Sequence, residues 1–372
     1  HTIDGRAESS ATFFDVINPA TGTTFDLAPN ASPEQLNEAV SAAQRAYSSW
    51  QRLSFAERSA LIGEFSESIK SHADEIAKVL TREQGKPLPQ AKGEVMDAAH
   101  ELKTLCQFEP HPELIRADDD SRVELHYRPL GVVGAITPWN YPVLLAASKI
   151  AQALYAGNTV VLKPATDTPF TGWLLTECFR DAGIPDGVFN FVTGSGRTVG
   201  QTLVDHPDTA GITFTGSYDV GMNILREFSH SKYPRPVIAE MGGKNPAIVS
   251  DKADLDKAAL GVLRSAFGLQ GQKCSACSRV YVHKDVKEAF TDKLLELTKQ
   301  ISVGDPTLKE NFMGPVANAG AYDDYQRFVA DLREAGNILY GGATLGEAGY
   351  FVAPTIVDDL PMDHYLWKHE MF

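Results

Sequence analysis

Cys274 has the setting in this sequence that best suits covalent chemistry. It follows Gly271-Gln272-Lys273, a polar stretch with a glycine, where we expect a flexible loop instead of a buried core. A cysteine attacks as its thiolate, and the adjacent Lys273 could lower the pKa of the thiol. A single cysteine is more often a small buried apolar side chain, so its assignment as a nucleophile depends on the other motifs.

Cys274 and Cys277 also form a C-x-x-C sequence, a pattern that occurs in redox pairs and in half of a zinc site. The sequence contains no second C-x-x-C and no H-x-x-H. A redox or metal role is therefore the weaker interpretation. A Cys277→Ser variant distinguishes a dithiol protein from an enzyme that uses Cys274 alone. The dithiol protein would lose its activity, whereas the enzyme would keep most of it.

Two further polar residues, Glu240 and Asn140, are of types that serve in catalysis. Glu240 lies between an apolar run and Met241-Gly242-Gly243-Lys244. We expect partial burial to raise its pKa toward that of a general base, and a salt bridge to Lys244 or a helix cap is an equal alternative. Asn140 follows another apolar run, where its amide could donate to an oxyanion or simply form a turn.

Two other segments could bind a phosphate-containing ligand. Gly216 and Gly221 bracket a turn into a predicted helix, whose N-terminus could face a pyrophosphate. This pattern is not G-x-G-x-x-G and is weak alone. Lys163 ends a further apolar run and could reach a ribose or a phosphate, or could extend into solvent.

The order of apolar and amphipathic segments predicts how these residues are positioned. The first third is helical, with capping boxes at Ser32 and Ser54. From Val123 onward, short apolar runs alternate with helical segments, which predicts a doubly wound parallel α/β sheet. The expected strands are 132–136, 159–162, 188–192, 211–214 and 237–239. Ligands bind such sheets at the carboxyl ends of the strands, where the candidate residues lie.

After Asp251 the alternation begins again, which predicts a second α/β domain with the boundary near residues 242–250. It contains expected helices near 255–269, 286–301 and 323–335 and an expected strand near 279–282. The sequence stops at Phe372 within a motif-like stretch, so we expect the C-terminal end of this domain to be missing.

Composition restricts the class of protein. The 372 residues include 34 basic and 48 acidic residues, a net charge of −14, which disfavours binding to nucleic acid or to an anionic membrane. No apolar run reaches the length of a membrane span, and the N-terminus lacks the regions of a signal peptide. Four cysteines are too few for a disulfide scaffold. We expect a cytoplasmic protein with reduced thiols.

The motifs, in their order and spacing, resemble those of the aldehyde dehydrogenase superfamily in its NAD(P)-dependent, non-phosphorylating form. The resemblance covers essentially the whole chain. The motifs that carry it are Asn18-Pro19-Ala20-Thr21-Gly22, Pro138-Trp139-Asn140, Leu162-Lys163-Pro164, Phe214-Thr215-Gly216-Ser217, Glu240-Met241-Gly242-Gly243-Lys244, Gly271-Gln272-Lys273-Cys274, Gly349-Tyr350-Phe351 and Glu370-Met371-Phe372.

This resemblance implies a fold and a reaction. The fold has a Rossmann-like cofactor domain (1–110 and 130–242), an oligomerisation hairpin (111–129) and an incomplete catalytic domain (243–372). The reaction oxidises an aldehyde to a carboxylate. Cys274 would form a thiohemiacetal and then a thioester, Asn140 would hold the oxyanion, and Glu240 would activate water. The alternative is a non-catalytic relative, but such proteins usually lose the nucleophile or the base.

The resemblance also implies cofactor-binding residues: Lys163 for the adenosine ribose, Trp139 and Ser217 along the dinucleotide, Glu370 for the nicotinamide ribose, and also Thr166, Gly216, Gly221 and Phe372. The cofactor is NAD or NADP. NAD-preferring members often carry Glu at the position of Thr166, and its absence lets Lys163 attract a 2′-phosphate. Residues 267–279 are similar to the 1-pyrroline-5-carboxylate dehydrogenase branch, which implies a semialdehyde substrate such as glutamate semialdehyde. A homodimer or homotetramer is implied if the C-terminal tail exists.

Overall fold

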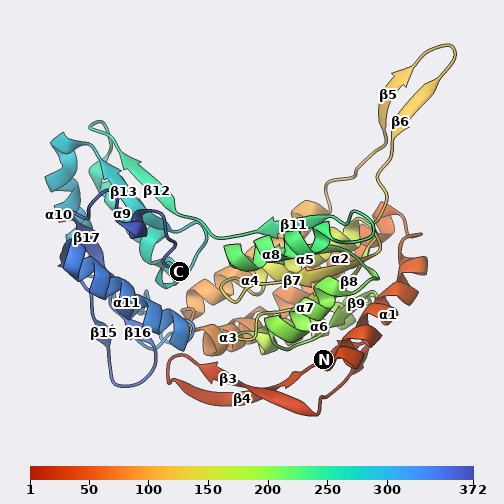
Figure 1. Ribbon diagram of the computed structural model, residues 1–372, viewed down its shortest axis with the longest axis horizontal. Helices are drawn as coiled ribbons and strands as arrows, with labels where there is room; N and C mark the ends of the chain where they lie inside the picture. Colours follow the sequence, from red (N-terminus) through yellow and green to blue (C-terminus); the bar gives the residue numbers. More distant parts are fainter. The chain divides into compact units, whose positions relative to one another are not determined.

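The computed structural model describes all 372 residues, and the chain divides into two compact units (Figure 1). The last crossing from unit 1 to unit 2 is at Glu240 and Met241, next to the boundary expected from the sequence. The sequence did not indicate that two earlier segments, 15–27 and 77–92, belong to unit 2. Unit 1 comprises His1–Phe14, Ala28–Ile76 and Gly93–Glu240, and unit 2 comprises Asp15–Leu27, Ala77–Lys92 and Met241–Phe372.

Unit 1 is built on a seven-stranded sheet in the order β11-β10-β7-β8-β9-β1-β2. The first five strands in this order are parallel, which confirms the predicted sheet, and β1 joins β9 in the antiparallel sense. The strands are β1 (Thr2–Ile3), β2 (Arg6–Ala7), β7 (Val132–Ile136), β8 (Thr159–Lys163), β9 (Phe189–Phe191), β10 (Thr209–Thr215) and β11 (Val237–Glu240). Every side chain of β8 and β9 is buried, as expected for strands covered on both faces.

The helices of unit 1 begin where the sequence provides N-terminal caps. Ser32 and Ser54 form the two predicted capping boxes, in which each serine side chain accepts a backbone N–H three residues later. Helices α1, α5, α6, α7 and α8 contact strands of the sheet. The helices are α1 (Pro33–Trp50), α2 (Phe55–Ser71), α5 (Leu144–Tyr155), α6 (Pro169–Asp181), α7 (Gln201–Asp205) and α8 (Tyr218–Ser229).

Four short strands precede the first helix, so the prediction that the first third is helical is wrong for its first 30 residues. Two of them, β3 (Thr12–Asn18) and β4 (Thr23–Asn30), have mostly exposed or half-buried side chains. Their alternation of apolar and polar residues is therefore too weak to identify them. The antiparallel hairpin of β5 (Glu113–Ala117) and β6 (Arg122–Leu125) is also exposed. Helices α3 (Ala73–Gln84) and α4 (Leu88–Leu105) lie between β4 and β5 in the chain.

Unit 2 contains the predicted helices and strand, but its strands form small two-stranded sheets instead of one extended sheet. Strand β12 pairs with β13 in parallel, and β14 with β17 and β15 with β16 are antiparallel. The elements are β12 (Asn245–Val249), α9 (Leu255–Phe267), β13 (Cys277–Val282), α10 (Lys287–Thr298), α11 (Ala319–Ala335), β14 (Asn337–Tyr340), β15 (Thr344–Leu345), β16 (Phe351–Val352) and β17 (Ile356–Asp358).

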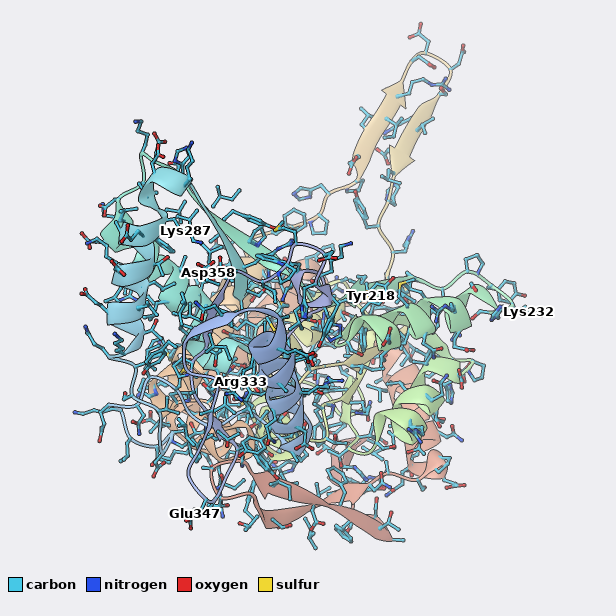
Figure 2. The ribbon with its side chains drawn as sticks, turned by 60° about the vertical axis from the view of Figure 1, so that its left-hand side comes forward. Tyr218, Lys232, Lys287, Arg333, Glu347 and Asp358 are labelled. Atoms are coloured by element: carbon cyan, nitrogen blue, oxygen red, sulfur yellow. The ribbon has the colours of Figure 1, made fainter.

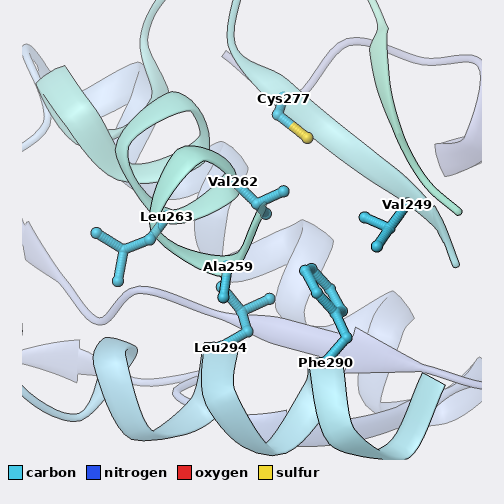
Figure 3. Packing of buried hydrophobic residues seen from close by; sticks show 7 residues of the cluster. All are labelled: Val249, Ala259, Val262, Leu263, Cys277, Phe290 and Leu294. Atoms are coloured by element: carbon cyan, nitrogen blue, oxygen red, sulfur yellow. The ribbon is translucent and has the colours of Figure 1, made fainter. Parts of the chain in front are cut away.

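The core of unit 2 joins β12, β13, α9 and α10 (Figure 3). Phe290 and Leu294 of α10 pack against Val262 of α9, and Cys277 of β13 belongs to the same cluster. The Lys287 ammonium of α10 forms an ion pair with the Asp358 carboxylate of β17 at 2.7 Å (Figure 2). In neither unit does any helix combine the length and the apolar character that crossing a membrane requires.

Candidate active site

The candidate residues of unit 1 lie at the carboxyl edge of its sheet. The parallel register pairs Lys163, the last residue of β8, with Ile136, the last residue of β7. It also pairs Glu240, the last residue of β11, with Thr215 of β10. Four neighbouring strands therefore end at the same level, and Asn140 follows β7 by four residues. This placement confirms the expectation that the polar residues gather at the strand ends.

Asn140 and its neighbours form the loop after β7. Asn140 is 3% exposed and Trp139 is half-buried. The loop is fixed to β8 by a hydrogen bond from the Thr137 N–H to the Lys163 carbonyl, at 3.2 Å. An amide held at a buried, fixed position is the kind of donor that can stabilise a developing negative charge.

Lys163 is 4% exposed, so it does not extend into solvent. Its ammonium donates to the Pro164 carbonyl at 2.7 Å. Burial lowers the pKa of Lys163 to about 8, and the negative charge of Asp167 counteracts part of this effect. An ammonium has three N–H donors, so further donors are available for a ribose or a phosphate. Thr166 is half-buried three residues later.

The turn from β10 into α8 has the form of an anion-binding helix start. Ser217 caps α8, and its side chain accepts the Val220 N–H at 3.5 Å. Gly216 precedes this cap, Gly221 is buried in the first turns of the helix, and Tyr218 is exposed at its start (Figure 2). The backbone N–H groups of such a start fit a pyrophosphate.

Glu240 is exposed, so the prediction that its carboxyl group is partly desolvated is wrong. Its strand is at the edge of the sheet, where one side has no neighbouring strand to bury it. Lys149, which is 8% exposed on α5, was not among the residues predicted from the sequence. Burial lowers the pKa of Lys149, and the charge of Glu240 counteracts this lowering. A charged residue within an apolar helix was the signal that could have identified Lys149.

In unit 2, Cys274 is exposed in a turn immediately before β13. The turn is closed by a hydrogen bond from the Ala276 N–H to the Lys273 carbonyl at 2.9 Å. The side-chain amide of Asn245 donates to the carbonyl of Cys274 at 2.6 Å and to that of Ala276 at 3.2 Å. The backbone of the nucleophile candidate is therefore held by the segment that follows Glu240.

The loop before Cys274 is not the flexible polar segment that the sequence predicts. Gln272 is fully buried, and its side chain accepts the Ala317 N–H at 2.9 Å and donates to the Leu269 carbonyl at 3.3 Å. Leu269 and Gln270 adopt positive φ angles of 54° and 57°, which is uncommon for residues other than glycine. Buried hydrogen bonds thus hold this loop in a specific, strained conformation.

Lys273 does not assist Cys274 as expected, and Cys277, three residues further along the chain, lies in a different environment. The Lys273 ammonium contacts the Arg264 carbonyl at the end of α9, at 3.4 Å, so the structure gives it a different partner. Cys277 is buried, with its thiol directed into the core of unit 2 (Figure 3), and burial raises the pKa of this thiol. Since one thiol is exposed and the other lies in the core, the redox and metal interpretations of C-x-x-C lose their support.

The Gly242-Gly243 turn connects Glu370 with the Cys274 loop. The Glu370 carboxylate accepts the Gly243 N–H at 2.9 Å. A Cβ atom on Gly242 would lie 1.8 Å from the Glu370 carboxylate, and one on Gly243 would lie 2.5 Å from the Cys274 carbonyl oxygen. At Gly243 a side chain would require the backbone of the Cys274 loop to move, whereas at Gly242 it would require only the Glu370 side chain to turn away. The Gly-Gly motif is visible in the sequence, but these two close approaches are not, because Cys274 and Glu370 are distant from it in the chain.

Two other residues complete this part of unit 2. The Lys244 ammonium is buried without a hydrogen-bond partner. Burial and the positive charge of Arg279 together lower the pKa of Lys244 to about 8, and the negative charge of Glu370 counteracts part of this lowering. Phe372 is half-buried. Unit 2 thus brings together Cys274, Glu370 and the Gly-Gly turn, and unit 1 brings together Asn140, Lys163, Gly216, Ser217, Gly221 and Glu240.

Curated proteins resemble this chain over most of its length. A 1-pyrroline-5-carboxylate dehydrogenase from Staphylococcus aureus is 37% identical over 96% of this chain and 71% of its own length. An alpha-ketoglutaric semialdehyde dehydrogenase from Bacillus subtilis is 38% identical over 96% of this chain and 75% of its own length. This chain thus spans about three quarters of these relatives.

Solved structures give the same result for the fold. An aldehyde dehydrogenase from Bacillus cereus, solved as an NAD+ complex, superposes with a TM-score of 0.96 at 32% identity, covering 100% of this chain and 77% of that one. The sequence model described as the Aldehyde dehydrogenase family matches residues 6–372. The chain therefore belongs to the aldehyde dehydrogenase family.

Proposed function

We propose that the protein oxidises a semialdehyde, such as glutamate semialdehyde, to the carboxylate with NAD or NADP. Its family supports aldehyde oxidation, and the names of its two curated relatives support a semialdehyde. The observation that carries the proposal is the setting of Cys274, an exposed thiol on a loop whose backbone is fixed by Asn245 and by the Gly242-Gly243 turn.

In the proposed reaction, the Cys274 thiolate attacks the aldehyde carbon, and a C–S bond forms as the carbonyl oxygen becomes an oxyanion. The side-chain amide of Asn140 and the Cys274 N–H donate to this oxyanion. A nicotinamide dinucleotide, when bound, would supply the acceptor for the hydride that this carbon loses, and the carbon then remains on Cys274 as a thioester. Glu240 then takes a proton from water, the resulting hydroxide attacks the thioester, and the thiolate leaves.

The residues of unit 1 fit the cofactor. Lys163 offers a buried positive charge with spare N–H donors, and the start of α8 at Ser217 offers backbone donors for a pyrophosphate. Thr166 itself carries no charge that would repel a 2′-phosphate, although the neighbouring Asp167 does, and we propose that Lys163 allows NADP to bind as well as NAD. In unit 2, Glu370 is the residue proposed to hold the nicotinamide ribose.

We also propose that the protein is a cytoplasmic homodimer or homotetramer. All four of its cysteines are unpaired, as expected in a reducing compartment. The isolated β5–β6 hairpin is exposed on both strands, and two-stranded hairpins are at best marginally stable alone. A second copy of the chain is the proposed partner of this hairpin.

The direct test measures the formation of reduced nicotinamide with NAD and NADP, using simple aldehydes, betaine aldehyde and glutamate semialdehyde as substrates. We expect turnover with a semialdehyde, loss of turnover in Cys274→Ala, and little change in Cys277→Ser. Turnover that survives Cys274→Ala would exclude the covalent mechanism. Cofactor binding without turnover of any aldehyde would instead indicate the alternative, a non-catalytic relative.

A further inference from the structure

We propose that unit 2 carries a second binding site, for a small carboxylate with an apolar body. The site is a cavity of about 720 Å³. This volume lies within the range of pockets that bind small molecules. None of the residues assigned above to catalysis or to the cofactor lines the cavity. The proposal is therefore independent of the proposed reaction.

One wall of the cavity consists of two sequence motifs that the reaction leaves unused. The Asn18 side chain accepts the Ala20 N–H at 2.9 Å and closes the Asn18–Gly22 turn. The Tyr350 N–H donates to the Pro19 carbonyl at 2.9 Å, which fixes the Gly349-Tyr350-Phe351 motif against this turn. Gly349 has a φ of +74°, and a Cβ atom there would lie 2.4 Å from the Ala20 carbonyl oxygen. The wall is thus tightly packed and preformed.

Helix α3 supplies the positive charge. Lys78 and Arg82 are four residues apart, on one face of the helix, and both line the cavity. Both side chains are exposed, and the structure shows no ion pair between either of them and a carboxylate. The Arg82 guanidinium lies 4.4 Å from the centre of the Phe25 ring, an arrangement that orients the group and leaves its N–H edge available.

The same turn of α3 carries a buried hydroxyl group that has no partner. Thr81 also lines the cavity, is 1% exposed, and its hydroxyl forms no hydrogen bond within the protein. Buried polar side chains are nearly always hydrogen-bonded, so this hydroxyl is open to a partner that a ligand supplies. A carboxylate held by Lys78 and Arg82 would supply the missing acceptor.

The remaining walls define the rest of the ligand. One acidic residue, Asp305, lines the cavity, and one of its carboxylate oxygens already accepts the Thr307 N–H at 2.9 Å and the Thr307 hydroxyl at 2.7 Å. The cavity therefore has two positive side chains, Lys78 and Arg82, and one carboxylate that is already hydrogen-bonded. Its net positive charge favours an anion. The apolar lining residues are Ala20, Val303, Pro306, Leu345, Ala348 and Phe351. Together these features fit an anionic head and an apolar body.

The test is calorimetric titration of the full chain with hexanoate, with hexanol and inorganic phosphate as separate titrants. We expect saturable binding of hexanoate with a Kd of about 1 mM or tighter. Lys78→Gln and Arg82→Gln should each weaken it about tenfold, and Thr81→Val by a smaller factor. Lys299→Gln, which removes an exposed charge elsewhere in unit 2, should bind like the wild type. Melting temperatures identify any variant that fails to fold. If Arg82→Gln does not fold, Lys78→Gln alone provides the test of the positive charge.

Three results would overturn the proposal. Absence of saturable hexanoate binding would exclude the site. Equal binding by the wild type and the three cavity variants would place hexanoate elsewhere, for example at the catalytic residues. Binding of hexanol or of phosphate as tight as that of hexanoate would show that the site does not require a carboxylate joined to an apolar body.

Discussion

At the scale of single residues, burial and hydrogen-bond partners decide what each side chain can do. Cys274 and Cys277 are three positions apart, yet one thiol is exposed on a fixed loop and the other lies in a core where burial raises its pKa. Lys163 is buried with one backbone acceptor, whereas Lys309 is exposed. The sequence identifies these residue types but not these environments, because burial depends on segments far away in the chain.

Burial of Lys163 predicts a specific dependence of stability on pH. Its pKa of about 8 in the folded state lies below the ordinary value of 10.5, so the unfolded chain binds more protons between these two pH values. The free energy of unfolding should therefore rise as the pH increases from 8 to 10.5. Lys163→Met should lack this contribution, which reaches about 3 kcal/mol.

Urea unfolding at pH 8 and pH 10 measures this difference, with Lys309→Met as the matched control at an exposed position. The control should retain the rise in stability seen in the wild type. If Lys163→Met shows the same rise as the wild type, then the pKa of Lys163 is not lowered in the folded protein.

The charge at position 166 predicts the choice of cofactor. Thr166→Glu places a negative charge three residues after Lys163, which should repel a 2′-phosphate. We expect the ratio of kcat/KM for NADP to that for NAD to fall by about tenfold or more. Thr166→Gln is the uncharged control of similar size and should leave the ratio nearly unchanged. If Thr166→Glu keeps the wild-type ratio, then the 2′-phosphate does not bind near residue 166.

Among the helices and strands, the sequence predicted the ones that bury a periodic apolar face or begin at a recognisable cap. The parallel strands of unit 1 and helix α9 lie within a few residues of the predicted ranges. The strands β3 and β4 were missed because their side chains are largely exposed. The membership of 15–27 and 77–92 in unit 2 was missed because it depends on packing between distant segments.

The Gly242-Gly243 turn yields a prediction about the nucleophile loop. Gly243→Ala would place a Cβ atom 2.5 Å from the Cys274 carbonyl oxygen, so the loop must move. Since small displacements of reacting groups lower rates strongly, kcat/KM should fall by about tenfold to a hundredfold. The rate of Cys274 alkylation by iodoacetamide should also change.

Gly261→Ala is the control for this prediction. Gly261 lies within α9, and a Cβ atom there meets no other group within 4 Å. This substitution should leave turnover unchanged and stabilise the protein by about 0.5–1 kcal/mol. Equal turnover in Gly243→Ala and Gly261→Ala would contradict the close packing between the turn and the Cys274 loop.

At the scale of the whole molecule, the exposed hairpin predicts an oligomer that depends on it. Ile115 is 62% exposed on β5, and Ile115→Lys should shift the protein to a smaller species in analytical ultracentrifugation. Leu308→Lys is the control, because Leu308 is 47% exposed on a loop of unit 2. If both variants sediment like the wild type, then the hairpin does not hold the oligomer together.

The covalent role of Cys274 is the central claim, and the Glu240→Gln variant tests it most directly. This substitution should slow hydrolysis of the thioester and leave its formation intact, because only the second step requires the general base. We expect a burst of about one reduced nicotinamide per active site. Mass spectrometry should then find the acyl group on the peptide that contains Cys274. Absence of both the burst and the acyl adduct, or an adduct on another residue, would contradict the mechanism.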